Sequence, residues 1–330
     1  MSSRNRFRHF ALGGMAAAAA LCALWLAAVA SLEGRAHAGN QWIEQVQTRK
    51  RAIAQQLDGP RALVVSGSSA LFGVDSKMLE QALGRPVANL ATNAGLLAPY
   101  LIDEARRALR PGDWVIVPLE YPLFHDEGEV NEAFIHYYAS HPLPAAQLGW
   151  WRWLKTMWLL PLQRIVEGHR GLPDGFVVRG TYGAHNLDDH GDQANSTRAR
   201  RTPAMLAELK AKPAKTYGQQ AWRGNASWTR WRRFAQDVRA LGGCAVFVPP
   251  ALLRREAYRS DAVEQRYYSL LPQEARAHGL VYVGAPFDFM YEEDQFFDTI
   301  YHLTSEARPG YTRQLIQALA QVSWRDCALK

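Results

Sequence analysis

The chain has 330 residues, of which 48% are hydrophobic, enough to bury a sizeable core in one large domain or two small ones. Its formal net charge is +7, but the lysines and arginines are scattered through helical stretches, and no nucleic-acid motif occurs. Composition therefore argues against a nucleic-acid-binding protein and favours an anionic membrane surface as the partner of the positive charge.

The N-terminus carries an export signal. Basic residues precede an uncharged apolar stretch, residues 10–32, which is long enough to span a bilayer. The basic flank stays in the cytoplasm, so we expect residues 1–9 to form a cytoplasmic tail and residues 10–32 a single anchor in the inner membrane. The rest of the chain then lies in the periplasm or outside the cell. A cleavable signal peptide is the alternative, because Ala36-His37-Ala38 is a small-x-small site.

Apolar periodicity predicts an α/β domain over residues 61–330, preceded by a juxtamembrane helix within residues 33–60. Strands are predicted at residues 62–65, 85–90, 113–119, 244–248 and 280–283, and helices at residues 76–83, 99–109, 226–241, 262–277 and 305–322. Strands separated by such helices form right-handed βαβ units, so we expect a parallel, five-stranded, flavodoxin-like sheet in a three-layer sandwich. Residues 121–217 hold no convincing strand and are predicted to be a long insertion after the third strand.

The first predicted strand stops at small polar residues, Ser66 to Ser69, and a helix follows. Such a turn lifts a side chain to the carboxyl edge of a sheet, where open α/β folds bind their ligands. A hydroxyl at this point, beside backbone N–H groups, is a candidate nucleophile next to an oxyanion site. The alternative is a serine-rich helix cap.

A base for this serine is predicted on the loop after the fifth strand. His302 lies just before the last helix, at the same edge of the sheet as Ser69, and Asp298 is close enough in sequence to fix its tautomer. These residues form a Ser-His-Asp set in the chain order Ser, Asp, His. A helix-capping or surface histidine is the alternative for His302.

This set of residues resembles the SGNH (GDSL-like) hydrolase superfamily, which has a flavodoxin-like sheet. It is most similar to the membrane-anchored branch that includes the D-alanyl-lipoteichoic acid transfer protein and the alginate O-acetylation proteins. The resemblance runs from about Ala62 to the C-terminus, apart from the insertion. It implies Ser69 of Gly67-Ser68-Ser69 as nucleophile and oxyanion donor, Gly95 as a second oxyanion donor, and His302 with Asp298 as the remaining catalytic residues.

The resemblance also implies an activity. An extracytoplasmic acyltransferase or esterase would act on a cell-envelope or exopolysaccharide polymer, with a surface polysaccharide or an acyl donor as its substrate. It would need no cofactor and no metal, and a membrane-bound acyltransferase would be its protein partner. The alternative is a catalytically silent, membrane-anchored scaffold or glycan-binding subunit of an envelope polysaccharide machine.

Two departures from the family pattern weaken the enzyme interpretation. The family has an oxyanion-hole asparagine after the third strand, where this chain has Glu120 and Tyr121. An ionised glutamate cannot donate to an oxyanion, so Asn93 is a candidate replacement, and Glu120 and Tyr121 become candidate substrate-binding residues. A structural pairing of Glu120 with an arginine is the alternative. The second departure is a spacing of four residues from Asp298 to His302 instead of three, which would align Asp298 less well.

The predicted insertion contains two unusual segments. Residues 149–160 are aromatic, basic and helical in spacing, as in interfacial membrane helices, in docking surfaces for a membrane partner or in an aromatic core helix. Residues 180–192 gather carboxylates and imidazoles, which suits a hard-metal loop, a solvated loop or an active-site flap, although the spacing matches no known cation loop.

Cysteine usage fits an exported protein. Cys244 and Cys327 follow the apolar stretch, and two cysteines in an oxidising compartment can form one disulfide.

Overall fold

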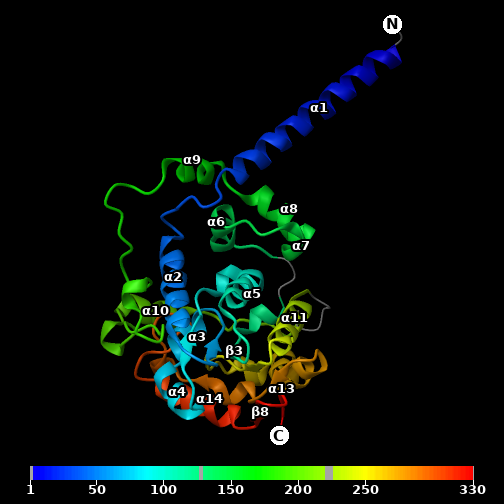
Figure 1. Ribbon diagram of the computed structural model, residues 1–330. Coiled ribbons are helices and arrows are strands. Elements are labelled where there is room, and N and C mark those ends of the chain that lie inside the picture. The colour runs from blue at the N-terminus through cyan, green and yellow to red at the C-terminus, as the bar shows by residue number, and fades with distance from the viewer. Residues whose placement is uncertain (1–2, 126–128, 220–225, 330) are drawn as a thin grey trace. The chain divides into compact units, whose positions relative to one another are not determined.

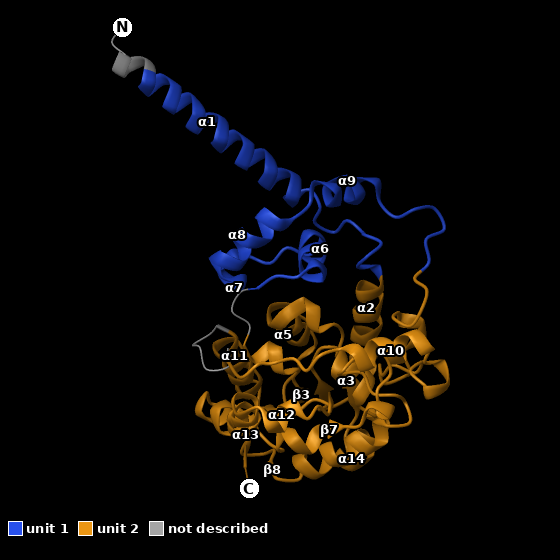
Figure 2. Ribbon diagram, turned by 180° about the vertical axis from the view of Figure 1, so that it is seen from behind, with its two compact units in different colours: residues 1–41, 128–177 blue, residues 42–127, 178–330 orange. Residues whose placement is uncertain are grey.

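The computed structural model describes residues 3–125, 129–219 and 226–329. The chain forms two compact units, shown in different colours in Figure 2. Unit 1 combines residues 1–41 with residues 128–177, and unit 2 combines residues 42–127 with residues 178–330. The predicted insertion, residues 121–217, is therefore divided between the two units.

Unit 2 is built on a parallel five-stranded sheet, as predicted. Its strands lie in the order β2 (Val87–Asn89), β1 (Ala62–Val64), β3 (Trp114–Pro118), β4 (Cys244–Val248) and β6 (Val281–Tyr282). Numbered along the chain, this is the order 2-1-3-4-5 of flavodoxin-like sheets. The apolar runs of the central strands are buried on both faces, which is why they read as continuous hydrophobic sequence.

Helices connect the strands of unit 2 by parallel crossovers (Figure 1). The connecting helices are α4 (Ser76–Leu83), α5 (Leu97–Ala108), α11 (Ala226–Ala240) and α13 (Ala262–Ala277), and α14 (Arg308–Leu319) closes the unit. α14 packs on α4 and on the short helix α3 (Ser68–Gly73), whereas α5 packs on α11. Right-handed crossovers put these two groups on opposite faces of the sheet, so the strand ends are left open at the carboxyl edge.

Smaller elements complete unit 2. They are α2 (Gln41–Gln56, from Trp42 onward), α10 (Pro203–Ala211), α12 (Ala257–Ser260), and the short helices Ala94–Leu96, Tyr121–Phe124, Ala184–Asn186, Arg198–Arg200, Pro286–Phe289 and Glu293–Gln295. β5 (Leu252–Leu253) pairs in parallel with β7 (Met290–Tyr291), and β8 (Val322–Ser323) pairs antiparallel with β9 (Ala328–Leu329). These two-residue strands lack a sequence pattern long enough to predict.

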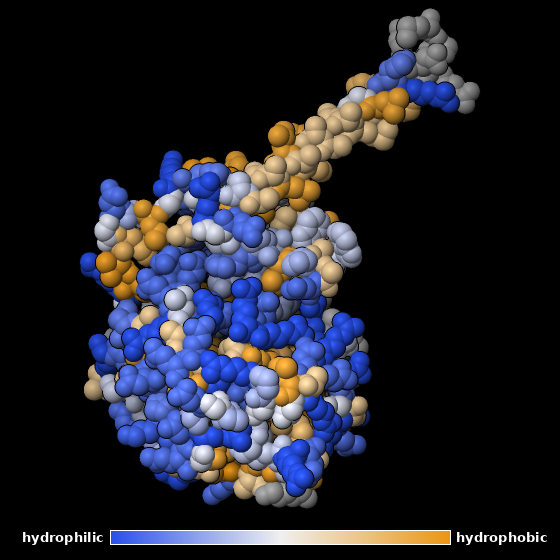
Figure 3. All heavy atoms as spheres, in the orientation of Figure 1, coloured by the Kyte–Doolittle hydropathy of each residue, from blue (hydrophilic) through white to orange (hydrophobic). Residues whose placement is uncertain are grey.

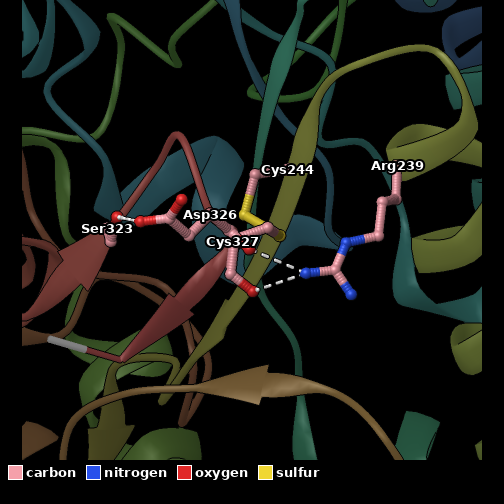
Figure 4. The surroundings of a disulfide bond; sticks show 5 residues. All are labelled: Arg239, Cys244, Ser323, Asp326 and Cys327. Carbon is pink, nitrogen blue, oxygen red and sulfur yellow. Dashed lines mark hydrogen bonds between the residues drawn. A yellow bond between two sulfur atoms is a disulfide. The ribbon is translucent and has the colours of Figure 1, made fainter.

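A disulfide joins Cys244 of β4 to Cys327, with 5.3 Å between the two Cα atoms (Figure 4). The Arg239 guanidinium donates hydrogen bonds to the carbonyls of Asp326 (2.8 Å) and Cys327 (3.2 Å) and holds the same turn. The pairing that the sequence permitted is therefore formed, and it ties the last hairpin to a central strand.

A buried ion pair joins the amino ends of β1 and β3. The side chains of Arg61 and Asp113 are 1% and 0% exposed, and Nη2 lies 2.5 Å from Oδ2. The Arg61 guanidinium also donates to the carbonyls of Ala54 in α2 and Ala108 in α5. The Asp113 carboxylate further accepts the backbone N–H groups of Arg61 and Arg110. This one pair therefore connects two strands and two helices.

Unit 1 is helical in its described part. It contains α1 (Ser3–Ala30), α6 (Glu132–Ser140), α7 (Ala145–Leu148), α8 (Trp150–Leu159) and α9 (Leu162–Arg170). Among the described residues, the segment Phe7–Ala30 of α1 is the single helix long and apolar enough to cross a membrane, and its surface is apolar along most of its length (Figure 3). Such a helix serves as a membrane anchor or as a signal sequence.

Candidate active site

The serine turn forms at the end of β1. Gly67 precedes α3, so Ser68 and Ser69 open this helix. A Cβ on Gly67 would come within 2.5 Å of a Glu120 carboxylate oxygen and of the Ala94 side chain, so this position requires glycine. The Ser69 side chain is buried, and its Oγ donates to the Pro118 carbonyl at 3.3 Å and lies 3.4 Å from Ser66 Oγ.

His302 and Asp298 lie on one tight loop. Phe296 and Leu303 form an antiparallel bridge across its base, and the Phe297 N–H donates to the His302 carbonyl at 2.7 Å. The loop brings Asp298 Oδ1 to 2.6 Å from His302 Nδ1. The spacing of four residues therefore does not misalign the pair, because the loop folds back between them.

His302 packs against the helix that carries Ser69. The imidazole stacks on the Phe72 ring, with 4.1 Å between centroids and 4° between planes. Phe72 lies three residues after Ser69 on α3, a spacing at which helical side chains are neighbours. Within the described residues, however, no hydrogen bond joins Ser69 to His302. The buried Arg308 guanidinium donates to the Phe72 carbonyl and so fixes the end of α3.

Tyr182 is a further residue of the site, which the sequence did not reveal. Its hydroxyl donates to Asp298 Oδ2 at 2.6 Å and lies 3.3 Å from His302 Nδ1. Burial, and then the Asp298 charge, raises the pKa of Tyr182 far above its usual range, so the phenol stays protonated as a donor. The segment 180–192, where an active-site flap was one expectation, supplies this residue; no periodic signal singles it out.

Asp298 is held in its ionised form. Burial alone would raise its pKa, but the hydrogen bond and charge of His302, together with the Tyr182 hydroxyl, outweigh that effect and lower the pKa. A carboxylate bonded to Nδ1 keeps the proton on that nitrogen and leaves Nε2 free to act as a base.

The Glu120 carboxylate accepts hydrogen bonds from the N–H groups at the serine turn. Its carboxylate accepts the backbone N–H of Ser69 at 2.8 Å, the N–H of Gly67 at 3.1 Å and the Ser66 hydroxyl at 2.9 Å, and its side chain is buried. The structural alternative for Glu120 was a pairing with an arginine; its partners here are backbone and hydroxyl donors. An oxyanion that used the Ser69 N–H would have to displace this carboxylate.

The other predicted oxyanion and binding residues are also engaged or buried. Asn93 Oδ1 accepts the Gly95 N–H at 2.7 Å and caps the short helix that follows. Tyr121 is fully buried among Tyr217, Tyr267 and Tyr268. The roles predicted for these residues stay predictions.

The carboxylates of residues 180–192 make structural contacts. Asp188 accepts the backbone N–H groups of His190 and Asp192. Asp192 is buried and accepts hydrogen bonds from Ser76 and from the Asn89 amide. In residues 3–125, 129–219 and 226–329, no group of three or more His, Cys, Asp or Glu residues is placed to hold a metal ion.

Lys50 of α2 is buried beneath this loop. Its amine donates to the Ala91 carbonyl at 2.6 Å and faces Asp192, Asp188 and Arg308. Burial lowers the pKa of Lys50 to about 7, although the two aspartates oppose the shift. The side chain therefore loses its charge near neutral pH in the folded protein and retains it in the unfolded chain.

The free energy of unfolding is accordingly expected to rise from pH 7 to pH 9. In this interval Lys50 is protonated in the unfolded chain and neutral in the folded chain. The free energy of unfolding therefore rises by at most about 1.4 kcal/mol per pH unit. Urea unfolding of the full chain in detergent at pH 7, 8 and 9 measures the slope. Lys50→Met should flatten it, and a slope that this variant leaves unchanged would contradict the assignment. At higher pH the buried tyrosines, whose pKa values are raised by burial, oppose the trend.

No protein-family model matches the chain, and no curated protein matches it. A solved structure from Streptococcus pneumonia, provisionally described as a platelet activating factor, is 14% identical to it. The match covers 86% of this chain and 94% of that chain, with a TM-score of 0.36. At this TM-score the likeness supports no particular activity.

Proposed function

We propose that the chain is a membrane-anchored, extracytoplasmic serine esterase or acyltransferase of the SGNH type. Its substrate would be an acyl group on, or destined for, a cell-envelope or exopolysaccharide polymer. α1 would be retained in the inner membrane, with the rest of the chain in the periplasm or outside the cell. Transfer to a polymer, as distinct from hydrolysis, follows from the sequence resemblance and the anchor.

The observation that carries the proposal is the Asp298–His302 pair, whose imidazole stacks on Phe72 of the helix that begins at Ser68. A buried histidine whose Nδ1 is bonded to a partly buried carboxylate is oriented to take a proton through Nε2. Phe72 supports the imidazole from the helix of Ser69, and Tyr182 supports the carboxylate. A surface or helix-capping histidine needs neither support.

The proposed reaction has two steps. Ser69 Oγ, turned away from the Pro118 carbonyl, attacks the acyl carbon while its proton passes to His302 Nε2. The acyl–oxygen bond then breaks, and the leaving alkoxide takes that proton from Nε2. A polymer hydroxyl, or water, attacks the acyl-serine and gives its proton to Nε2, which passes it to the departing Ser69 oxygen and so restores the hydroxyl. Throughout both steps the Asp298 carboxylate accepts the hydrogen bond from Nδ1–H, and the proton stays on Nδ1.

A fluorophosphonate probe tests the proposal, because it labels an activated serine and leaves an ordinary helix-capping serine unmodified. The full chain in detergent should be labelled on Ser69, and Ser69→Ala should abolish the label. Ser68→Ala, one residue away on the same turn, is the matched control and should keep it. Absence of Ser69 labelling in a folded chain would refute the enzyme proposal.

A catalytically silent scaffold or glycan-binding subunit is the second candidate, and the contacts of Glu120 favour it. Its carboxylate accepts the N–H groups that an oxyanion needs. In the described part of the chain, Ser69 Oγ donates to the Pro118 carbonyl and makes no hydrogen bond to His302.

Glu120→Asn separates the two candidates. The shorter amide should release the Ser69 N–H and offer a donor in its place, so ester hydrolysis should rise about 10²-fold if Ser69 is catalytic. Hydrolysis of p-nitrophenyl acetate by the full chain in detergent measures the change, with Glu120→Asn/Ser69→Ala as the background. No rise above that background would favour the silent scaffold.

A further inference from the structure

Apolar side chains gather on the exposed face of α8 and α9 in unit 1. Trp158 is the most exposed of them, at 87%. The others are Trp150, Trp151, Leu154, Leu159, Leu162 and Val166. An exposed apolar patch rimmed by polar residues marks an interaction surface, and the tryptophans add the amphipathic rings found at membrane interfaces.

A groove of about 530 Å³ lies between α8 and the C-terminal half of α1. Its walls are apolar side chains of both helices, including Leu21, Trp25 and Leu26 from α1, and Trp153, Met157 and Leu160 from α8 and its end. The Trp25 indole N–H donates to the Met157 carbonyl at 3.0 Å. The Met157 carbonyl is in the last turn of α8 and has no partner within the helix. The indole N–H and this carbonyl therefore satisfy each other, as polar groups away from water must.

The position of the groove across the bilayer follows from the length of α1. With Arg8 at the cytoplasmic interface and a rise of 1.5 Å per residue, Leu21 lies about 20 Å and Trp25 about 26 Å across the bilayer. The hydrocarbon core is about 30 Å thick, so both residues fall within its outer half. Because Met157 of α8 contacts Trp25 of α1 at this level, the exposed face of α8 lies at the depth of acyl chains.

The basic side chains of α8 and α9 lie where the outer lipid headgroups would be. α9 contacts the chain just beyond α1, where Ser31 Oγ lies 2.9 Å from His169 Nε2. This point is about 35 Å from Arg8, at the level of the outer headgroups. His169 and Arg170 are exposed there, as basic groups beside lipid phosphates would be. Lys155 of α8 is half-buried, and its four-carbon stem allows its amine to reach the same level.

We propose that α8 is immersed in the outer leaflet of the bilayer and that lipid acyl chains fill the groove between α8 and α1. This inference rests on the membrane anchoring within the proposed function. It adds a second, non-spanning contact that fixes the depth of unit 1 in the membrane.

Environment-sensitive labels test the immersion. In the full chain with Cys22→Ala, a single cysteine is introduced by Trp158→Cys, Leu162→Cys, Leu24→Cys or Val177→Cys and labelled with NBD. Each protein is reconstituted into phosphatidylethanolamine/phosphatidylglycerol vesicles. Leu24 is an exposed position of α1 and reports the anchor, whereas Val177 is exposed outside the patch and reports water.

At positions 158 and 162, iodide quenching should be at least fivefold weaker than at position 177, and doxyl-labelled lipids should quench strongly. Labels at these positions that iodide quenches as readily as position 177, while position 24 stays protected, would overturn the immersion of α8 and leave the anchor intact. A water-accessible label at position 24 would overturn the anchor itself. Protection that disappears when protein is diluted 25-fold in lipid would show that a second copy, and not lipid, covers the face, which also overturns the proposal.

Discussion

Asp298→Asn is expected to lower ester hydrolysis by about 10⁴-fold while leaving the fold intact. The carboxylate accepts both the Nδ1–H of His302 and the Tyr182 hydroxyl, each at 2.6 Å. An amide at this position donates to Nδ1, which moves the imidazole proton to Nε2 and removes the base. Loss of the correct tautomer in serine hydrolases has an effect of this order. Initial rates with p-nitrophenyl acetate, corrected for the Ser69→Ala background, measure the fall.

Tyr182→Phe is the matched control for this prediction. It removes one neutral hydrogen bond to Asp298 and keeps the carboxylate, so the rate should fall by about tenfold or less. Loss of this donor should also raise the pKa of Asp298 and shift the acid limb of the rate profile to higher pH. If Asp298→Asn and Tyr182→Phe have equal effects on the rate, Asp298 does not set the tautomer of His302.

Asp113→Ala should destabilise unit 2 by about 3–5 kcal/mol. The substitution leaves the Arg61 guanidinium, which is 1% exposed, without its counter-ion in the interior. Two backbone N–H groups lose their acceptor at the same time. Urea unfolding of the full chain in detergent, followed by circular dichroism, gives the change in free energy.

An exposed ion pair provides the comparison for Asp113. Asp237 pairs with Arg106 at 2.5 Å, but both side chains are about half exposed. Asp237→Ala should therefore cost less than about 1 kcal/mol. Similar costs for the two variants would mean that burial of the Arg61–Asp113 pair does not determine its contribution.

The sheet could be predicted from the sequence because its strands are short apolar runs bounded by turn residues. The loops after these strands meet at the carboxyl edge, so Ser69 and His302 were both expected there. The contact of His302 with α3 agrees with that expectation, although no hydrogen bond joins the two residues in the structure.

The contacts that define the site chemically were not predictable. Tyr182 reaches Asp298 across 116 residues of sequence, in a segment without periodicity. Glu120 was recognised as a departure from the family pattern, but its acceptance of the Ser69 N–H depends on how β3 ends beside β1. Nor could the sequence show that residues 1–41 join residues 128–177 in one unit, because packing between helices has no signature in either segment alone.

The discontinuity of unit 1 has a consequence for the order of folding. During synthesis, α1 emerges well before α8, and the whole of β1, β2 and β3 is made between them. The apolar side of α1 is therefore made before α8, which packs beside it, and three of the five strands of the sheet exist before β4 and β6. Both surfaces stay exposed during that interval unless a chaperone or a bilayer covers them, so slow synthesis of residues 128–177 should favour aggregation over assembly.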